Sequence, residues 1–168
     1  SELYGKIKKP IQDEKTNFYP RSPYAVSKLF AHWIGINYRE AYKMHVCNGI
    51  LFNHESPRRG DTFVTKKIVS SVVKLIRGEQ NTIHLGNLNA KRDWGHAKDY
   101  VKAMHSIVQY KKPDDWVIST GRTTSVRSFL IKTFNYFGIS LYFKGTGLNE
   151  KGYIKLCKNR KFNLKKHS

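Results

Sequence analysis

The stretch YPRSPYAVSK, residues 19–28, predicts a helix that begins just before Tyr24. Ser22 offers a side-chain oxygen as N-cap, and Pro23 suits the first helical position, where no backbone N–H is needed. Tyr24 and Lys28 would then lie one turn apart on the same face, so the ammonium can stabilise a tyrosinate. Taken alone, such a pair also fits a packed ring beside a solvated charge.

Apolar patterning outside this stretch alternates between strands and helices. The expected helices are residues 24–42, 62–77, 96–110 and 125–137, and the expected strands are residues 44–52, 82–85, 116–120 and 140–143. Gly78 and Gly138 are placed to end two of the helices. The apolar run 44–52 suits a buried parallel strand, and Asn53 would lie at its carboxyl end, where open α/β sheets bind ligands. The pattern predicts an α/β fold.

A glycine-rich turn of the kind that binds dinucleotides is missing from this alternation. The nearest candidate, Gly145-Thr146-Gly147, follows the last expected strand and has no third glycine, so it is interpreted as a loop. The chain therefore resembles the second half of a Rossmann-like parallel-sheet domain, and we expect it to be a fragment.

Length and composition indicate a folded chain. The 168 residues are 39% hydrophobic and 13% aromatic, which supports a core. The sequence contains neither an apolar run of membrane-spanning length nor the pattern of a signal peptide, so a cytoplasmic, membrane-free protein is expected. Cys47 and Cys157 lack the spacing of a disulfide framework or zinc site, and Cys47 is interpreted as a small core residue.

The formal net charge of +19 raises the question of a polyanionic partner. Lysines and arginines crowd the end of the chain after Lys151, where a solvated, poorly ordered tail is the simpler interpretation. Zinc-finger spacing and RNP-type aromatic motifs are both missing. Salt-sensitive, nonspecific adhesion is therefore favoured over specific nucleic-acid binding.

Five segments together carry a family resemblance. They are SELYG at 1–5, YPRSPYAVSK at 19–28, NHESPRRG at 53–60, LGNL at 85–88 and RDWGHAKDYV at 92–101. In this order they resemble the GDP-mannose 4,6-dehydratases, which belong to the extended short-chain dehydrogenase/reductases. The resemblance covers residues 1–152, which would form a partial NAD(P)- and substrate-binding domain with part of the small sugar-nucleotide-binding region. Residues 153–168 would form a divergent basic tail.

The resemblance implies a dehydration of GDP-mannose in the synthesis of GDP-fucose and related deoxyhexoses, with NADP as a cofactor that ends unchanged. Tyr24 would take the proton of the C4 hydroxyl, with Lys28 supporting it and holding the nicotinamide ribose. Glu2 would remove the C5 proton and protonate the departing C6 hydroxyl. For Glu2 the plainer alternative is a solvent-exposed terminal carboxylate, but its spacing to Tyr24 matches the family.

The same resemblance implies the binding residues. His54 and Arg59 would contact NADP, and the GDP-mannose contacts would come from Asn53, Lys67, Leu85, Gly86 and Arg92. Lys67 equally fits a solvated helix face, and Arg92 has an alternative as a salt-bridge partner of Asp93 or Asp99. Trp94 is interpreted as packing. No metal ligand set is expected, because His54 and Glu55 have no further His or Cys at ligand spacing.

The resemblance also implies a homo-oligomer that associates through the helix carrying Tyr24. The family's Arg-Pro segment and nucleotide-clamping glutamate do not appear after Gly152, so these 168 residues alone are expected to be inactive. A non-catalytic remnant that acts as an assembly or polyanion-binding module is the alternative function.

Overall fold

The computed structural model describes residues 1–7 and 9–158. The chain forms two compact units. The first combines Ser1–Ser56 with Asp93–Arg122, and the second combines Pro57–Arg92 with the chain from Thr123 onward.

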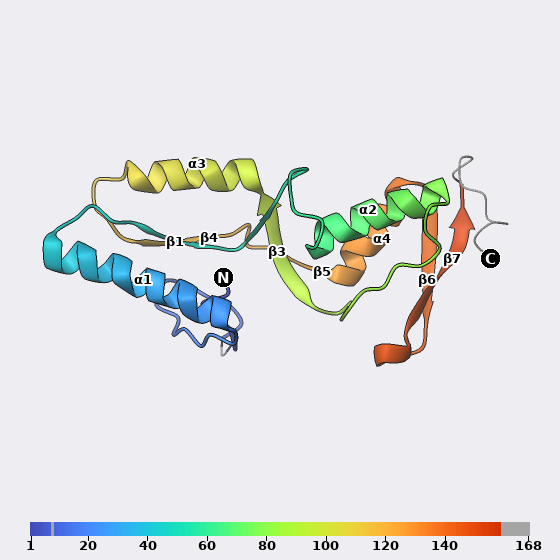
Figure 1. Ribbon diagram of the computed structural model, residues 1–168, viewed down its shortest axis with the longest axis horizontal. Coiled ribbons are helices and arrows are strands. Elements are labelled where there is room, and N and C mark those ends of the chain that lie inside the picture. Colours follow the sequence, from blue (N-terminus) through green and yellow to red (C-terminus); the bar gives the residue numbers. More distant parts are fainter. Residues whose placement is uncertain (8, 159–168) are drawn as a thin grey trace. The chain divides into compact units, whose positions relative to one another are not determined.

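The first unit is an α/β arrangement with parallel strand pairs. Its elements are α1 (Pro23–Tyr42), β1 (Asn48–Leu51), β2 (Asn53–Glu55), most of β3 (Lys91–His96), α3 (Ala97–Val108) and β4 (Asp115–Ile118). β1 pairs with β4 and β2 pairs with β3, both in parallel. α1 packs against β1 and α3 packs against β4. The two helices lie on opposite faces of the β1–β4 pair (Figure 1).

The core of this unit joins the start of the chain to β1. Leu3, Tyr4 and Ile50 are almost fully buried. Four partly buried residues pack against them: Phe18, Leu29, Phe52 and Val117. Tyr4 also donates a hydrogen bond to the Asp13 carbonyl at 2.8 Å. These contacts fix the first turn of the chain, which carries Glu2, at the carboxyl end of β1.

The second unit packs two helices and a hairpin. Its elements are α2 (Val64–Arg77), β5 (Thr123–Ser125), α4 (Val126–Tyr136), β6 (Ile139–Lys144), the 3-10 helix η1 (Gly147–Asn149) and β7 (Lys151–Cys157). α4 packs against both α2 and β6, and β6 pairs with β7 in an antiparallel hairpin (Figure 1). The buried apolar side chains include Ile68, Val72, Leu130, Phe134 and Ile139.

The α/β class and the four predicted helices are confirmed. Ser22 and Ser125 cap α1 and α4 through their hydroxyl oxygens, and Gly78 ends α2 in the left-handed region at φ 75°. No helix within the described residues has the length and apolar character needed to cross a membrane.

The strands differ from the prediction in several places. Residues 82–85 form no strand, and the run 44–52 contributes only Asn48–Leu51 to β1. β3 was not expected, because the sequence KRDWGH lacks an apolar run. Residues 153–157, expected to begin a solvated tail, instead form most of β7, where pairing with β6 satisfies their backbone. The rest of that expected tail, apart from Lys158, lies outside the described residues.

Candidate active site

The first turn of α1 presents Tyr24 and Lys28 on one face. The Ser22 hydroxyl accepts a hydrogen bond from the Ala25 amide at 3.1 Å, which fixes where the helix begins. Lys28 Nζ lies 5.4 Å from the centre of the Tyr24 ring. Both side chains are exposed in the described structure, Tyr24 by 60%. The predicted phenol–ammonium pair therefore forms and is accessible to a ligand.

Glu2 reaches the same region from the beginning of the chain. The Ser1 nitrogen donates to the Leu51 carbonyl at the end of β1, and the Tyr4 amide donates to the Ser1 carbonyl at 3.1 Å. Leu3 and Tyr4 are buried in the core on the other side of this turn. The carboxylate of Glu2 is left exposed beside the carboxyl end of β1.

A pocket of about 350 Å³ gathers the side chains of these segments. Glu2, Tyr24 and Lys28 line it together with His54. The remaining lining comes from Ser1, Leu3, Ala31, His32, Asn48, Gly49, Ile50 and Leu51. The structure thus brings together one carboxylate, one phenol, one ammonium and two imidazoles, which are groups that can move protons between a ligand and the protein.

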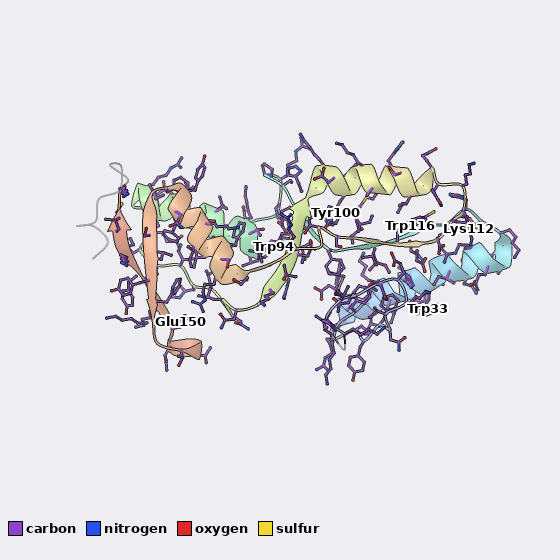
Figure 2. The ribbon with its side chains drawn as sticks, turned by 180° about the vertical axis from the view of Figure 1, so that it is seen from behind. Trp33, Trp94, Tyr100, Lys112, Trp116 and Glu150 are labelled. Atoms are coloured by element: carbon purple, nitrogen blue, oxygen red, sulfur yellow. The ribbon has the colours of Figure 1, made fainter. Side chains whose placement is uncertain are left out.

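His54 is held in this pocket by two contacts. A carbonyl only accepts, so Nδ1 of His54 donates to the Phe52 carbonyl at 2.9 Å, and Nε2 remains as the other polar atom of the ring. The His54 ring stacks on Tyr100, with 4.8 Å between ring centres and 29° between planes. Figure 2 shows Tyr100 in the first turn of α3, beside β3. Burial, followed by the nearby Asp93 carboxylate, raises the pKa of Tyr100 to about 12, so its phenol stays neutral.

A buried polar cluster fixes α1 on the β1–β4 pair. Asp115 accepts hydrogen bonds from Arg39 at 3.0 Å and Asn48 at 2.9 Å. His32, only 7% exposed, places Nε2 3.7 Å from the other Asp115 oxygen. Burial lowers the pKa of His32, Asp115 raises it and Arg39 lowers it. Sequence reasoning missed this cluster, because Arg39 and Asp115 are 76 positions apart, His32 is farther still from Asp115, and the members form no local motif.

The approach of α1 to β1 depends on Gly35. A Cβ at this position would lie 2.5 Å from the Asn48 side-chain oxygen. Asn48 in turn donates to the His32 carbonyl at 3.2 Å. The close packing therefore directs the start of α1 to the end of β1, where the pocket lies.

Asn53, predicted to contact the substrate, does not line the pocket, whereas its neighbour His54 does. Successive side chains on a strand point to opposite faces, and both residues belong to β2. The substrate contact of Asn53 stays a prediction. Asn53 pairs in register with Trp94 of β3, and both residues are half-buried.

The other predicted binding residues belong to the second unit. Lys67 is exposed on the first turn of α2, and Arg59 Cζ lies 3.5 Å from the centre of the Phe63 ring. Leu85 is half-buried, and Gly86 is exposed with open space where a side chain would begin. Arg92 is exposed and donates to the Lys91 carbonyl at 2.8 Å. The ligand-binding roles of these five residues stay a prediction.

Part of the RDWGH segment has a structural role that the sequence did not reveal. Asp93 is 5% exposed, and both of its oxygens accept the Thr120 amide at 3.1 Å. The Thr120 hydroxyl donates to the same carboxylate at 2.9 Å. Asp93 therefore ties β3 to the chain after β4. Trp94, expected to pack, is half-buried.

The sequence matches the family model described as GDP-mannose 4,6 dehydratase over residues 1–167. The match continues past Gly152, where the resemblance was expected to end. The chain is 58% identical over 153 residues to the GDP-mannose 4,6 dehydratase of Dictyostelium discoideum, covering 91% of this chain and 43% of that protein. It is 55% identical to the Homo sapiens protein of the same name, covering 92% of this chain and 42% of the relative. The chain thus spans about two-fifths of the length of these relatives.

Solved structures share the fold of this chain. The RMD of Pseudomonas aeruginosa, complexed with NADPH, matches with a TM-score of 0.71 and 24% identity, over 75% of this chain and 44% of that one. The dTDP-glucose 4,6-dehydratase of Bacillus anthracis, complexed with NAD, matches with a TM-score of 0.74 and 22% identity, over 82% of this chain and 43% of that one. The family model, which matches nearly the whole sequence, shows that the chain belongs to the GDP-mannose 4,6-dehydratase family.

Proposed function

We propose that this chain supplies the catalytic residues of an NADP-dependent GDP-mannose 4,6-dehydratase, a lyase. The enzyme converts GDP-mannose to GDP-4-keto-6-deoxymannose with loss of water, in the synthesis of GDP-fucose and other deoxyhexoses. One observation carries the proposal: Glu2, Tyr24 and Lys28 line a single pocket although they come from two separate segments. The reaction needs two proton-transfer groups, and the pocket offers a carboxylate and a phenol.

The pocket also fits a nicotinamide nucleotide. Lys28 and Tyr24 present an ammonium and a hydroxyl to a ribose, and His54 offers Nε2 because Nδ1 is bound to the Phe52 carbonyl. Arg59 belongs to the second unit. Its guanidinium group is suited to bind a phosphate of NADP, because it is planar and can pair with two oxygens at once. The hydride chemistry belongs to NADP when bound, with C4 oxidised first and C6 reduced last.

The protein groups move the protons. Tyr24 takes the proton of the C4 hydroxyl, and Lys28 places a positive charge 5.4 Å from the ring that would carry the phenolate. Once C4 is a ketone, the C5 proton becomes acidic, because its removal gives a stabilised enolate. Glu2 would remove that proton and then protonate the C6 hydroxyl, which leaves as water. Reduction of C6 then needs one proton at C5, which balances the proton that Tyr24 took from the C4 hydroxyl.

Within the second unit, GDP-mannose binding is assigned to Lys67, Leu85, Gly86 and Arg92. Lys67 and Arg92 are exposed cations suited to the diphosphate or ribose, while Leu85 and Gly86 offer backbone to the guanine edge. The open space at Gly86 supports this assignment. Asn53, by contrast, would need to reach the nucleotide from the face of β2 opposite to His54.

Association of copies through α1 accompanies this proposal, and the enzyme is placed in the cytoplasm. Phe30 and Trp33 are 68% and 57% exposed, and they line a shallow apolar pocket with Ile34 on the outer face of the helix. Neighbouring exposed apolar side chains on one helix face favour a contact site there. The same observation favours the second candidate function, a non-catalytic module that assembles with a complete dehydratase through α1.

Turnover of GDP-mannose with NADP separates the two functions. The 168-residue chain is compared with a version extended by its flanking coding sequence on both sides. We expect product only from the extended protein, because the chain itself contains no glycine-rich dinucleotide turn. Glu2→Gln in the extended protein should abolish product. No turnover by either form, together with cosedimentation with a complete dehydratase, would instead establish the assembly module.

A further inference from the structure

Arg127, at the start of α4, makes four side-chain hydrogen bonds in the second unit. Its Nη1 and Nη2 donate to the two carboxylate oxygens of Glu150 at 2.6 and 2.9 Å. Nη2 and Nε also donate to the Asn89 side-chain oxygen at 3.0 and 3.3 Å. The guanidinium carbon lies 4.8 Å from the centre of the Phe143 ring. Arg127 therefore joins two loops, one carrying Asn89 and the other carrying Glu150.

Backbone contacts bind the Asn89 loop to the same end of α4. The Arg127 amide donates to the Leu88 carbonyl at 2.8 Å, and the Val126 amide donates to the Ala90 carbonyl at 3.0 Å. These amides belong to the first turn of α4, where backbone donors have no partner within the helix. The carbonyls of the Asn89 loop accept these two hydrogen bonds, and the same bonds hold the loop against the start of α4.

The Asn89 loop is itself a tight turn. The Asn87 side-chain oxygen accepts the Asn89 amide at 2.9 Å, and the Asn87 carbonyl accepts the Ala90 amide at 3.3 Å. The turn directly follows Leu85 and Gly86, and a Cβ added at Gly86 would meet no other atom within 4 Å. The side chain of Arg127 thus hydrogen-bonds to the segment that immediately follows the proposed guanine-contacting residues.

Glu150 anchors the other side of the guanidinium. It directly follows η1 and precedes β7, and Figure 2 shows it at that end of the hairpin. Its side chain is 17% exposed and that of Arg127 is 25% exposed, so water competes only partly for the contact. The pairing with Arg127 lowers the pKa of Glu150, so the carboxylate stays charged.

We propose that Arg127 is a positioning residue for nucleotide binding, which holds residues 85–90 in the shape that receives the guanine base of GDP-mannose. This inference rests on the proposed function. Lysine cannot replace arginine here, because one ammonium cannot pair both Glu150 oxygens and the Asn89 oxygen in a planar fork. A loosened loop would have to be ordered again upon binding, which weakens affinity without touching the chemical step.

The test compares Arg127→Lys with the unchanged extended protein. We expect KM for GDP-mannose to rise about tenfold with kcat within about twofold, and the Kd of GDP alone to rise by a similar factor. Hydrogen exchange should become faster at the backbone amides of residues 126 and 127, because they donate to the carbonyls of the loosened loop. Arg77→Lys is the matched control, since Arg77 is 68% exposed and 3.9 Å from Glu79; it should change none of these quantities.

Asn89→Ala keeps the inference testable if Arg127→Lys fails to fold, because Asn89 is exposed and the substitution removes only one side of the contact. It should raise the Kd of GDP in the same direction. Unchanged GDP affinity in both variants, or a fall in kcat with KM unchanged, overturns the positioning role. If the wild-type extended protein binds GDP but does not dehydrate GDP-mannose, the proposed function is wrong. The positioning role of Arg127 is then decided by the GDP affinities of the variants alone. Wild-type protein that does not bind GDP defeats both.

Discussion

Lys28 Nζ lies 5.4 Å from the centre of the Tyr24 ring, one turn further along α1. The pair faces a pocket that also contains Glu2, which is contributed by the first turn of the chain. Two separate segments of sequence therefore supply every group assigned to proton transfer. They are joined by the core around Tyr4 and Ile50 and by backbone hydrogen bonds, among them the Tyr19 amide to the Leu3 carbonyl at 3.2 Å.

Tyr24→Phe should lower kcat of the extended protein for GDP-mannose about 10²–10⁴-fold, because the C4 hydroxyl then has no proton acceptor. Lys28→Met should cause a loss of similar size and should also weaken NADP binding. Tyr42→Phe is the matched control, since Tyr42 lies on the same helix, is 68% exposed and does not line the pocket. Steady-state kinetics measure the effect. A Tyr24→Phe variant as active as the Tyr42→Phe variant would remove the phenol from the mechanism.

Gly95→Ala should destabilise the protein by about 1–3 kcal/mol, because a Cβ there would lie 2.5 Å from Tyr100 Cε2 and 3.0 Å from Thr120 Cγ2. Tyr100 is nearly fully buried and stacks on His54, so it has little room to move. Urea unfolding measures the free-energy change. Gly49→Ala is the control: its Cβ would meet its neighbours at an ordinary 3.7 Å. Equal stability of the two variants would show that Tyr100 repacks freely.

Asp93→Ala should destabilise the protein by about 1–3 kcal/mol, because the Thr120 amide and hydroxyl lose a shared acceptor. Combining it with Thr120→Val should cost less than the sum of the single changes, because both remove the same contact. Chemical denaturation of the four proteins gives the coupling energy. Asp61→Ala, an exposed carboxylate, should be nearly neutral. Strict additivity of Asp93→Ala and Thr120→Val would contradict the contact.

Local sequence signals were sufficient for α1 and for the spacing of the candidate catalytic residues. The cap at Ser22 and the four-residue interval from Tyr24 to Lys28 are encoded within ten consecutive residues. The family resemblance then implied a role for Glu2, and the structure brings all three to one pocket. Their catalytic roles stay a prediction.

Contacts between distant residues could not be predicted in this way. Arg39 and Asp115 are 76 positions apart, and Arg127 reaches Asn89 across 38 positions. Neither pair stands in a motif, so only the folded chain reveals them. β3 was not predicted for a different reason. Its sequence KRDWGH is mostly polar, and it pairs with β2 through backbone hydrogen bonds, which leave no pattern in the side chains.

His32 should make stability depend on pH. Burial lowers its folded-state pKa below the ordinary value of about 6.5, with Asp115 opposing and Arg39 reinforcing the shift. Between that lowered pKa and 6.5, the unfolded chain binds a proton that the folded chain does not. The free energy of unfolding is therefore expected to be fully developed above pH 6.5 and to fall as the pH decreases through this window.

Urea unfolding of wild type and His32→Gln between pH 5 and pH 8 measures this dependence. His32→Gln should flatten the slope below about pH 6.5, because the protonation difference at this position is removed. His105→Gln is the control, since His105 is exposed and belongs to the last turn of α3. If the slope persists in His32→Gln and disappears in His105→Gln, the buried imidazole is not its source, and the cluster around Asp115 fixes α1 without any cost from protonation.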